Sequence, residues 1–221
     1  MRKAFLAALL IMVIVMGVAG SSPAAATWSL SDDYSTSSNP NGQWSYGWEA
    51  TLGGAFTLYD TTTGSQWYDK DHHSGDLTPC VWKNGGSSTS YGVAPGEISL
   101  HPGWDNSFSV VKWTASIADT ISISGYFGAG DWGAMSYYIL LNGAVLFEKK
   151  NDAHTESFSL SETVASGDIL EFVVGVGNGG YGYGNTPLDV TITSSAVPVP
   201  AAVWLLGSGL IGLAARRKMG K

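Results

Sequence analysis

The stretch SYYILLNGAVLFEKK, residues 136–150, predicts the fold class of this chain. Two apolar runs flank the dipeptide Asn142-Gly143. A tight type I′ turn needs such a pair, because both of its central residues take positive φ. We therefore expect a β-hairpin here, and a sheet to which this hairpin belongs.

On either side of the hairpin, apolar and polar residues alternate with a period of two, which indicates strands. Such alternation is seen in SFSVVKW (107–113), DTISISGYF (119–127) and TPLDVTITSS (186–195), and DILEFVVGVG (168–177) is apolar enough to lie in mid-sheet. Short glycine- and asparagine-rich turns separate these runs, and no run has helical periodicity. Residues 27–194 are therefore expected to form a single all-β domain, a jelly-roll-like β-sandwich.

The front of the chain has the three-part signature of a secretory signal peptide. Arg2 and Lys3 precede an apolar run over residues 4–18, and Ala24 and Ala26 supply the small residues of a cleavage site. An uncleaved membrane anchor is the alternative, but the run is short for a span. We expect signal peptidase to remove residues 1–26 and the protein to be exported.

The back of the chain, AVPVPAAVWLLGSGLIGLAARRKMGK (196–221), carries a second apolar run. Ala201–Ala215 contains no charge, and as a helix it is about 22 Å long, short of a hydrocarbon core of about 30 Å. It has no polar face, which argues against an amphipathic surface helix. A basic cluster follows it: Arg216, Arg217 and Lys218. This cluster should stay in the cytoplasm, with the body of the chain outside the inner membrane.

A proline-marked motif, a marginal span and a basic cluster in this order resemble the PEP-CTERM sorting signal, in its VPLPA-type variant. The motif residues are Val197, Pro198, Val199, Pro200 and Ala201. Val199 replaces the glutamate of the commonest form, which leaves open which enzyme reads the motif. The resemblance implies a sorting signal over residues 195–221 and cleavage near the motif by a membrane exosortase. It also implies a Gram-negative host that makes extracellular polysaccharide, with the protein at the cell surface or in the extracellular matrix.

The body of the chain is strongly acidic. Residues 27–196 hold all 18 acidic residues, five lysines and no arginine, a formal charge of 5 − 18 = −13. A surface this acidic repels phosphates and argues against nucleic-acid binding. Cys80 is the single cysteine, so no intrachain disulfide can form. We expect it to be a buried small hydrophobe rather than a nucleophile paired with a histidine.

Several aromatic residues lie in turn-like, mostly glycine-rich segments, where they could form a carbohydrate-binding surface. The candidates are Trp67, Trp104, Trp132, Tyr181 and Tyr183. The apolar face of a pyranose packs on such rings while neighbouring polar groups bind its hydroxyls. The alternative is that these rings fill or cap the core. We expect that outcome for Trp44 and Trp113, which lie inside strand-like runs.

The segment WYDKDHHSGD (67–76) is dense in acidic residues. Its carboxylates, Asp69, Asp71 and Asp76, are candidate ligands for a calcium ion. The spacing does not match an EF-hand, and His72-His73 lacks the further spaced ligands of a zinc site. A solvated acidic loop is the competing interpretation.

The sequence contains no nucleophile elbow, HExxH or P-loop motif, and we predict that the protein is not an enzyme. The body, including NPNGQWSYGW at 39–48, resembles segments of other secreted proteins with such a tail. That resemblance implies a jelly roll similar to carbohydrate-binding modules. The leading hypothesis is a surface or matrix protein that binds exopolysaccharide through its loop aromatics. The alternatives are a self-assembling structural protein without glycan binding and a polysaccharide hydrolase or lyase.

Overall fold

The computed structural model describes residues 25–195, of which Thr27–Ser195 form one compact unit. The predicted signal peptide up to Ala24, and the predicted tail with its motif, span and basic cluster, lie outside the described residues. Within residues 25–195, no helix is long and apolar enough to cross a membrane.

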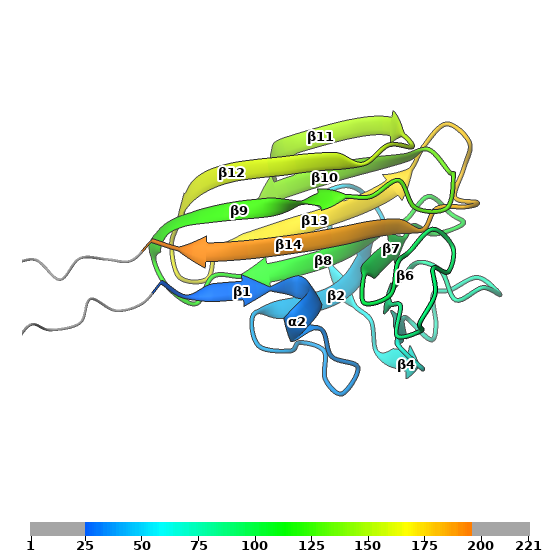
Figure 1. The fold of residues 1–221 in the computed structure, drawn as a ribbon, viewed down its shortest axis with the longest axis horizontal. Coiled ribbons are helices and arrows are strands. Elements are labelled where there is room, and N and C mark those ends of the chain that lie inside the picture. Colours follow the sequence, from blue (N-terminus) through cyan, green and yellow to red (C-terminus); the bar gives the residue numbers. More distant parts are fainter. Residues whose placement is uncertain (1–24, 196–221) are drawn as a thin grey trace, which may run out of the picture. The chain divides into compact units, whose positions relative to one another are not determined.

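The unit consists of two antiparallel sheets (Figure 1). The first contains, in spatial order, β12 (Glu156–Val164), β9 (Asp119–Phe127), β14 (Thr186–Ser194), β7 (Ile98–His101), β6 (Cys80–Lys83), β5 (Gln66–Tyr68) and β4 (Thr61–Thr63), and β1 (Thr27–Ser29) pairs with β14. The second contains β11 (Ala144–Asp152), β10 (Met135–Leu141), β13 (Ile169–Val176), β8 (Phe108–Thr114), β2 (Trp44–Glu49) and β3 (Thr57–Leu58). A one-turn helix, α2 (Leu30–Asp33), follows β1. The predicted all-β sandwich is confirmed.

The last eight strands have jelly-roll topology. The order β12-β9-β14-β7 in one sheet faces β11-β10-β13-β8 in the other, so the chain passes repeatedly from sheet to sheet. In this arrangement the connections β7–β8, β9–β10, β11–β12 and β13–β14 lie at the same end of the sandwich, which we call the loop end (Figure 1). The first residue of β1, Thr27, pairs with Thr193 at the opposite end.

The hairpin at residues 136–150 forms as predicted. Leu141 pairs with Ala144 across the turn, and Asn142 and Gly143 have φ values of 50° and 80°. These positive angles match the right-handed twist of the flanking strands, which is why Asn-Gly is favoured at this position.

The core between the sheets contains the two tryptophans predicted to be buried. Trp44 and Trp113 pair across β2 and β8 and are almost completely shielded from solvent. Cys80 is also buried, and burial raises the pKa of its thiol to about 12. At neutral pH the thiol is therefore protonated and unreactive, which confirms the prediction that it acts as a small hydrophobe.

Strand β8 differs from its predicted alternation, because both of its faces are buried. The polar residue Ser109 faces the core, where its hydroxyl donates to the Cys80 carbonyl (2.8 Å) and lies 3.2 Å from the Tyr59 hydroxyl. On the other face, Leu52 and Phe56 pack over an apolar patch of the second sheet. Segment 50–56 therefore covers a face that the sequence pattern alone left open.

Candidate functional site

Three exposed aromatic rings lie on loops that pack against one another. Tyr91, Trp132 and Tyr183 are 66%, 87% and 67% exposed, and we call them the aromatic rim. Their φ angles are 50°, 67° and 56°. Bulky residues rarely adopt positive φ, and such strain persists where the surrounding structure imposes it, often at functional sites.

Glycines lock these rim loops together. A Cβ on Gly92 would lie 2.0 Å from the carbonyl oxygen of Gly130, and a Cβ on Gly130 would lie 1.7 Å from that of Asn185. The amide of Gly133 donates to the carbonyl of Tyr183 at 3.0 Å. Backbone therefore packs directly on backbone, which holds the loops of Tyr91, Trp132 and Tyr183 in one arrangement.

A buried histidine anchors the β13–β14 loop. His101, at the end of β7, has its Nδ1 2.8 Å from the Pro102 carbonyl, and its Nε2 accepts the amide of Gly184 at 3.2 Å. Both contacts require a neutral ring with its proton on Nδ1. Burial lowers the pKa of His101, although the charges of Asp131 and Asp76 act in the opposite direction. The neutral ring is thus the form that holds this loop.

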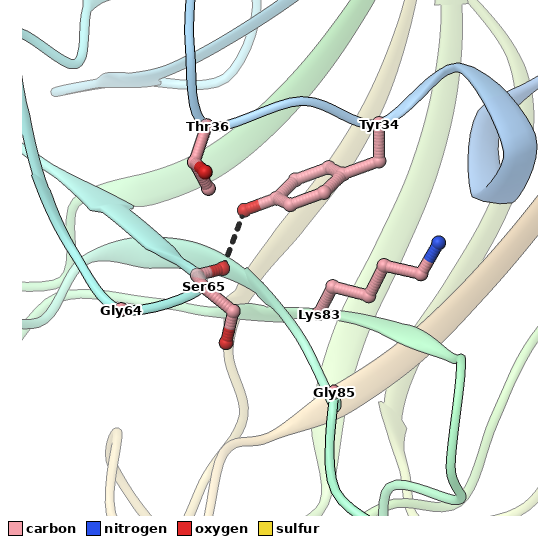
Figure 2. Close-up of a pocket in the computed structure, with 6 residues that line it drawn as sticks. All are labelled: Tyr34, Thr36, Gly64, Ser65, Lys83 and Gly85. Carbon is pink, nitrogen blue, oxygen red and sulfur yellow. Dashed lines mark hydrogen bonds between the residues drawn. The ribbon is translucent and has the colours of Figure 1, made fainter.

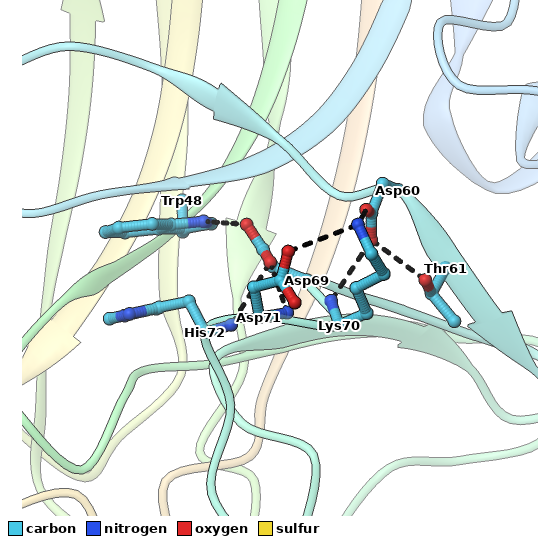
Figure 3. Close-up of polar contacts among 7 residues, drawn as sticks. All are labelled: Trp48, Asp60, Thr61, Asp69, Lys70, Asp71 and His72. Atoms are coloured by element: carbon cyan, nitrogen blue, oxygen red, sulfur yellow. Dashed lines mark hydrogen bonds and ion pairs between the residues drawn. The ribbon is translucent and has the colours of Figure 1, made fainter.

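A second aromatic group stacks three rings from separate segments. His72 lies against Trp48 of β2, with ring centroids 3.7 Å apart and an interplanar angle of 8°, and 4.9 Å from Trp104 of the β7–β8 loop. Carboxylates orient the stack: Trp48 Nε1 donates to Asp69 at 2.9 Å (Figure 3). On the other ring, His72 Nε2 lies 3.3 Å from Asp105. Trp104 is 42% exposed, so one part of its indole packs on His72 while the rest faces solvent.

The structure separates the predicted carbohydrate-binding candidates. Trp132 and Tyr183 are highly exposed, Trp104 is half-exposed, and Tyr181 is partly buried with its ring 6.1 Å from His101. The prediction for Trp67 is wrong, as described next. For the other four residues, glycan contact stays a prediction.

Trp67 belongs to the core. It is 6% exposed, because β5 is flanked by β4 and β6 and turns this side chain inward. Its Nε1 donates to the Ser35 carbonyl at 2.7 Å, which satisfies the indole away from solvent.

Sequence reasoning missed Tyr91, Trp48 and His72. Tyr91 lies in NGGSSTSYG, a glycine-rich setting like that of Trp132, and this context was an available signal. Trp48 and His72 carried no such signal, because their stacking depends on contacts between distant segments.

In the acidic segment predicted as a calcium site, the carboxylates make local hydrogen bonds and ion pairs. Asp69 accepts hydrogen bonds from the amides of Asp71 (2.8 Å) and His72 (3.1 Å), and Asp71 pairs with Lys70 at 3.2 Å (Figure 3). Among residues 25–195, no three His, Cys, Asp or Glu side chains are grouped so that they could hold a metal ion. Asp69 and Asp71 act here as turn and ion-pair acceptors, and calcium binding by Asp69, Asp71 and Asp76 stays a prediction.

A pocket of about 210 Å³ is lined by none of the residues of the aromatic rim or of the stack (Figure 2). It is lined by Tyr34, Thr36, Gly64, Ser65, Lys83 and Gly85. The Tyr34 hydroxyl donates to the Ser65 carbonyl at 2.7 Å, and Lys83 Nζ donates to the Ser31 carbonyl at 2.6 Å. The pocket contains no carboxylate and no predicted site residue.

Two carboxylates with a raised pKa lie under segment 50–56. Glu49 is fully buried, and burial together with the charge of Glu171 raises its pKa to about 7. The amide of Gly54 donates to Glu49 Oε2 at 3.2 Å. A glycosidase needs two carboxylates that reach its substrate. Glu49 and Glu171 are covered by protein, so this pair does not form an open catalytic site.

Comparison with known proteins identifies the tail. Residues 196–218 match the PEP-CTERM protein-sorting motif, so the chain carries this sorting signal and is an exported protein. The match includes the predicted motif Val197–Ala201 and the basic cluster Arg216–Lys218. No curated protein matches the sequence.

Comparison of the body with solved structures returns carbohydrate-binding modules among the matches. One is CBM51 from Clostridium perfringens GH95 in complex with methyl-galactose (12% identity, 76% of this chain, 100% of that chain, TM-score 0.36). A second is CBM51-2 with the INT domains of C. perfringens ZmpB, in complex with GlcNAc (13% identity, 76% of this chain, 32% of that chain, TM-score 0.37). A third is CBM35 from Paenibacillus barcinonensis (15% identity, 48% of this chain, 84% of that chain, TM-score 0.29). The chain spans about a third of the ZmpB structure. Likeness at this level concerns architecture and assigns no ligand.

Proposed function

We propose that this protein is processed by an exosortase-type enzyme and displayed at the cell surface or in the extracellular matrix, where it binds carbohydrate through its aromatic rim. The observation that supports this most is the conformation of the rim: three exposed aromatic residues with positive φ, on loops locked by glycine contacts. The backbone conformation alone would favour glycine or asparagine at these positions. The presence of large rings there therefore supports a role for the rings in binding.

A rigid rim suits the recognition of a flexible polymer. Each group that becomes ordered on binding loses conformational entropy, and a surface that is already rigid loses less of it. Tyrosine and tryptophan also supply large contact areas with few rotatable bonds. Asp131 directly precedes Trp132 in the chain, and its carboxylate is a group that can bind hydroxyls.

The topology also fits display on a surface. Thr27 and Thr193 pair at the end opposite the loop end, so both ends of the folded unit emerge there. Trp132 and Tyr183 lie on the β9–β10 and β13–β14 connections, at the end of the sandwich opposite Thr27 and Thr193. Signal peptidase, the exosortase and the inner membrane are the partners that this route requires.

The test is affinity electrophoresis of the full chain, in a detergent without a sugar headgroup, through gels cast with the host's exopolysaccharide. We expect retardation, and we expect Trp132→Ala to weaken it about tenfold, since a stacked ring contributes ~1 kcal/mol or more. Ile117→Ala, which alters an exposed apolar residue at the other end, is the matched control.

Other outcomes distinguish the alternatives. Absence of retardation would contradict carbohydrate binding. Oligomers that form without glycan and dissolve on Trp132→Ala would support self-assembly instead. Shortening of the polymer during incubation would support a hydrolase or lyase.

A further inference from the structure

The five lysines of the described chain all contact residues that lie outside the loops of the aromatic rim. Lys70 pairs with Asp60 and Asp71, Lys149 with Glu156 and Lys150 with Glu148, Lys83 donates to the Ser31 carbonyl, and Lys112 lies 4.1 Å from the Phe56 ring centroid. Residues 25–195 contain no arginine. The rim loops, 84–97, 128–134 and 177–185, contain neither lysine nor arginine. The rim loops themselves therefore offer no lysine or arginine to an anionic sugar.

One carboxylate, that of Asp131, in contrast belongs to a rim loop. Asp131 directly precedes Trp132, and its amide is fixed to the Asn185 carbonyl at 3.2 Å. Both Asp131 and Asp76 act electrostatically on His101, the residue that anchors the β13–β14 loop. Within the described part of the chain, no hydrogen bond occupies the side chain of Asp131. This carboxylate is available to a ligand.

From this arrangement we infer that the rim recognises glycans that carry free amino groups, such as polymers of de-N-acetylated hexosamine. The inference rests on the proposed function and specifies the class of ligand. A sugar ammonium group is attracted by the face of an exposed indole and by an adjacent carboxylate. Trp132 and Asp131 offer both on neighbouring residues. Uronate and sulfate groups would be repelled by the same carboxylate and by a body of net charge −13.

The test measures binding of the full chain, in the same detergent, to three immobilised oligosaccharides of equal length: glucosamine, N-acetylglucosamine and galacturonate oligomers. We expect the glucosamine oligomer to bind about fivefold to tenfold more tightly than its N-acetylated form. This preference should shrink as salt is added, because the contribution is electrostatic. Galacturonate should not bind.

Variants separate the charge from the ring. Asp131→Asn should remove the preference for the amine and keep binding to the N-acetylated oligomer. Asp119→Asn, which makes the same change of charge at the opposite end of the sandwich, should keep the preference. Trp132→Ala should weaken binding to both sugars.

The outcomes also separate this inference from the proposed function. Equal binding to the amine and its N-acetylated form, or tighter binding to galacturonate, would overturn the inference while carbohydrate binding stands. A preference for the amine that survives Asp131→Asn would also overturn it. Failure to bind any of the three, together with no retardation in the host polysaccharide, would contradict the proposed function itself.

Discussion

The amide of Gly184 donates a hydrogen bond to Nε2 of buried His101, over 3.2 Å, and this contact fastens the loop of Tyr183 to strand β7. The acceptor is a lone pair that exists only on the neutral imidazole. Protonation of His101 would therefore remove the acceptor of the Gly184 amide, so the stability of this rim loop should depend on pH.

Acid should loosen the β13–β14 loop. The pKa of His101 is lowered below its ordinary value of 6.5, so its stabilising effect is present above that value and is lost as the pH falls through the lowered pKa. Protection factors for amide hydrogen exchange at residues 181–185, which are corrected for the intrinsic effect of pH, should therefore be high at neutral pH and lower in acid. His101→Phe removes the acceptor of the Gly184 amide, so it should lower the protection of this loop at every pH. His154→Phe, at an exposed histidine, is the control and should leave the protection of the loop and its pH dependence unchanged. Equal protection of residues 181–185 across this range would contradict the prediction.

Glu49→Gln should stabilise the protein in mild alkali. Because the pKa of Glu49 is raised from 4.5 to about 7, folding favours its protonated form. The stabilisation is present below pH 4.5 and is lost as the pH rises through about 7. In urea unfolding of the full chain at pH values above 7, the free energy of unfolding of the wild type should be lower than that of Glu49→Gln. Glu148→Gln, at an exposed carboxylate paired with Lys150, is the control and should show little change.

The stack around His72 should position Trp104. Replacing His72 by Ala removes a ring that contacts both indoles and should cost about 1 kcal/mol of stability. Tryptophan fluorescence should shift to the red as Trp104 gains solvent. His72→Phe keeps an aromatic ring in the stack and should restore most of the original spectrum. An unchanged spectrum in His72→Ala would show that the stack does not hold Trp104.

Substitution of Gly92 should destabilise the protein more than substitution of Gly96, a glycine with a similar positive φ but open space around it. Gly92→Ala introduces a Cβ 2.0 Å from the Gly130 carbonyl in addition to strain at φ +75°. We expect a loss of several kcal/mol, because backbone must shift to make room. Gly96→Ala carries similar strain at φ +85° with nothing within 4 Å, so it should cost only about 1–2 kcal/mol. Gly179→Ala, with open space and no positive φ, should be nearly neutral. Equal midpoints of thermal unfolding for all three variants would refute the packing argument.

Local sequence pattern accounts for much of the fold. The hairpin follows from Asn142-Gly143, because the two positive φ angles of its turn are set by the residues that occupy it. Strand β9 occupies residues 119–127, where isoleucine and serine alternate, since period-two burial is a property of each strand taken alone. The sorting signal was also readable from the chain, because its parts are contiguous.

The strands, the tight turn and the sorting signal could therefore be predicted from the chain alone, because each depends on neighbouring residues. Which aromatic rings are exposed depends instead on contacts between distant segments. Trp67 and Trp132 both appeared as loop aromatics, yet Trp67 is buried between strands and bonded to Ser35, 32 residues away, whereas Trp132 is almost fully exposed. Exposure depends on which distant segments cover a side chain, and a local pattern does not contain that information.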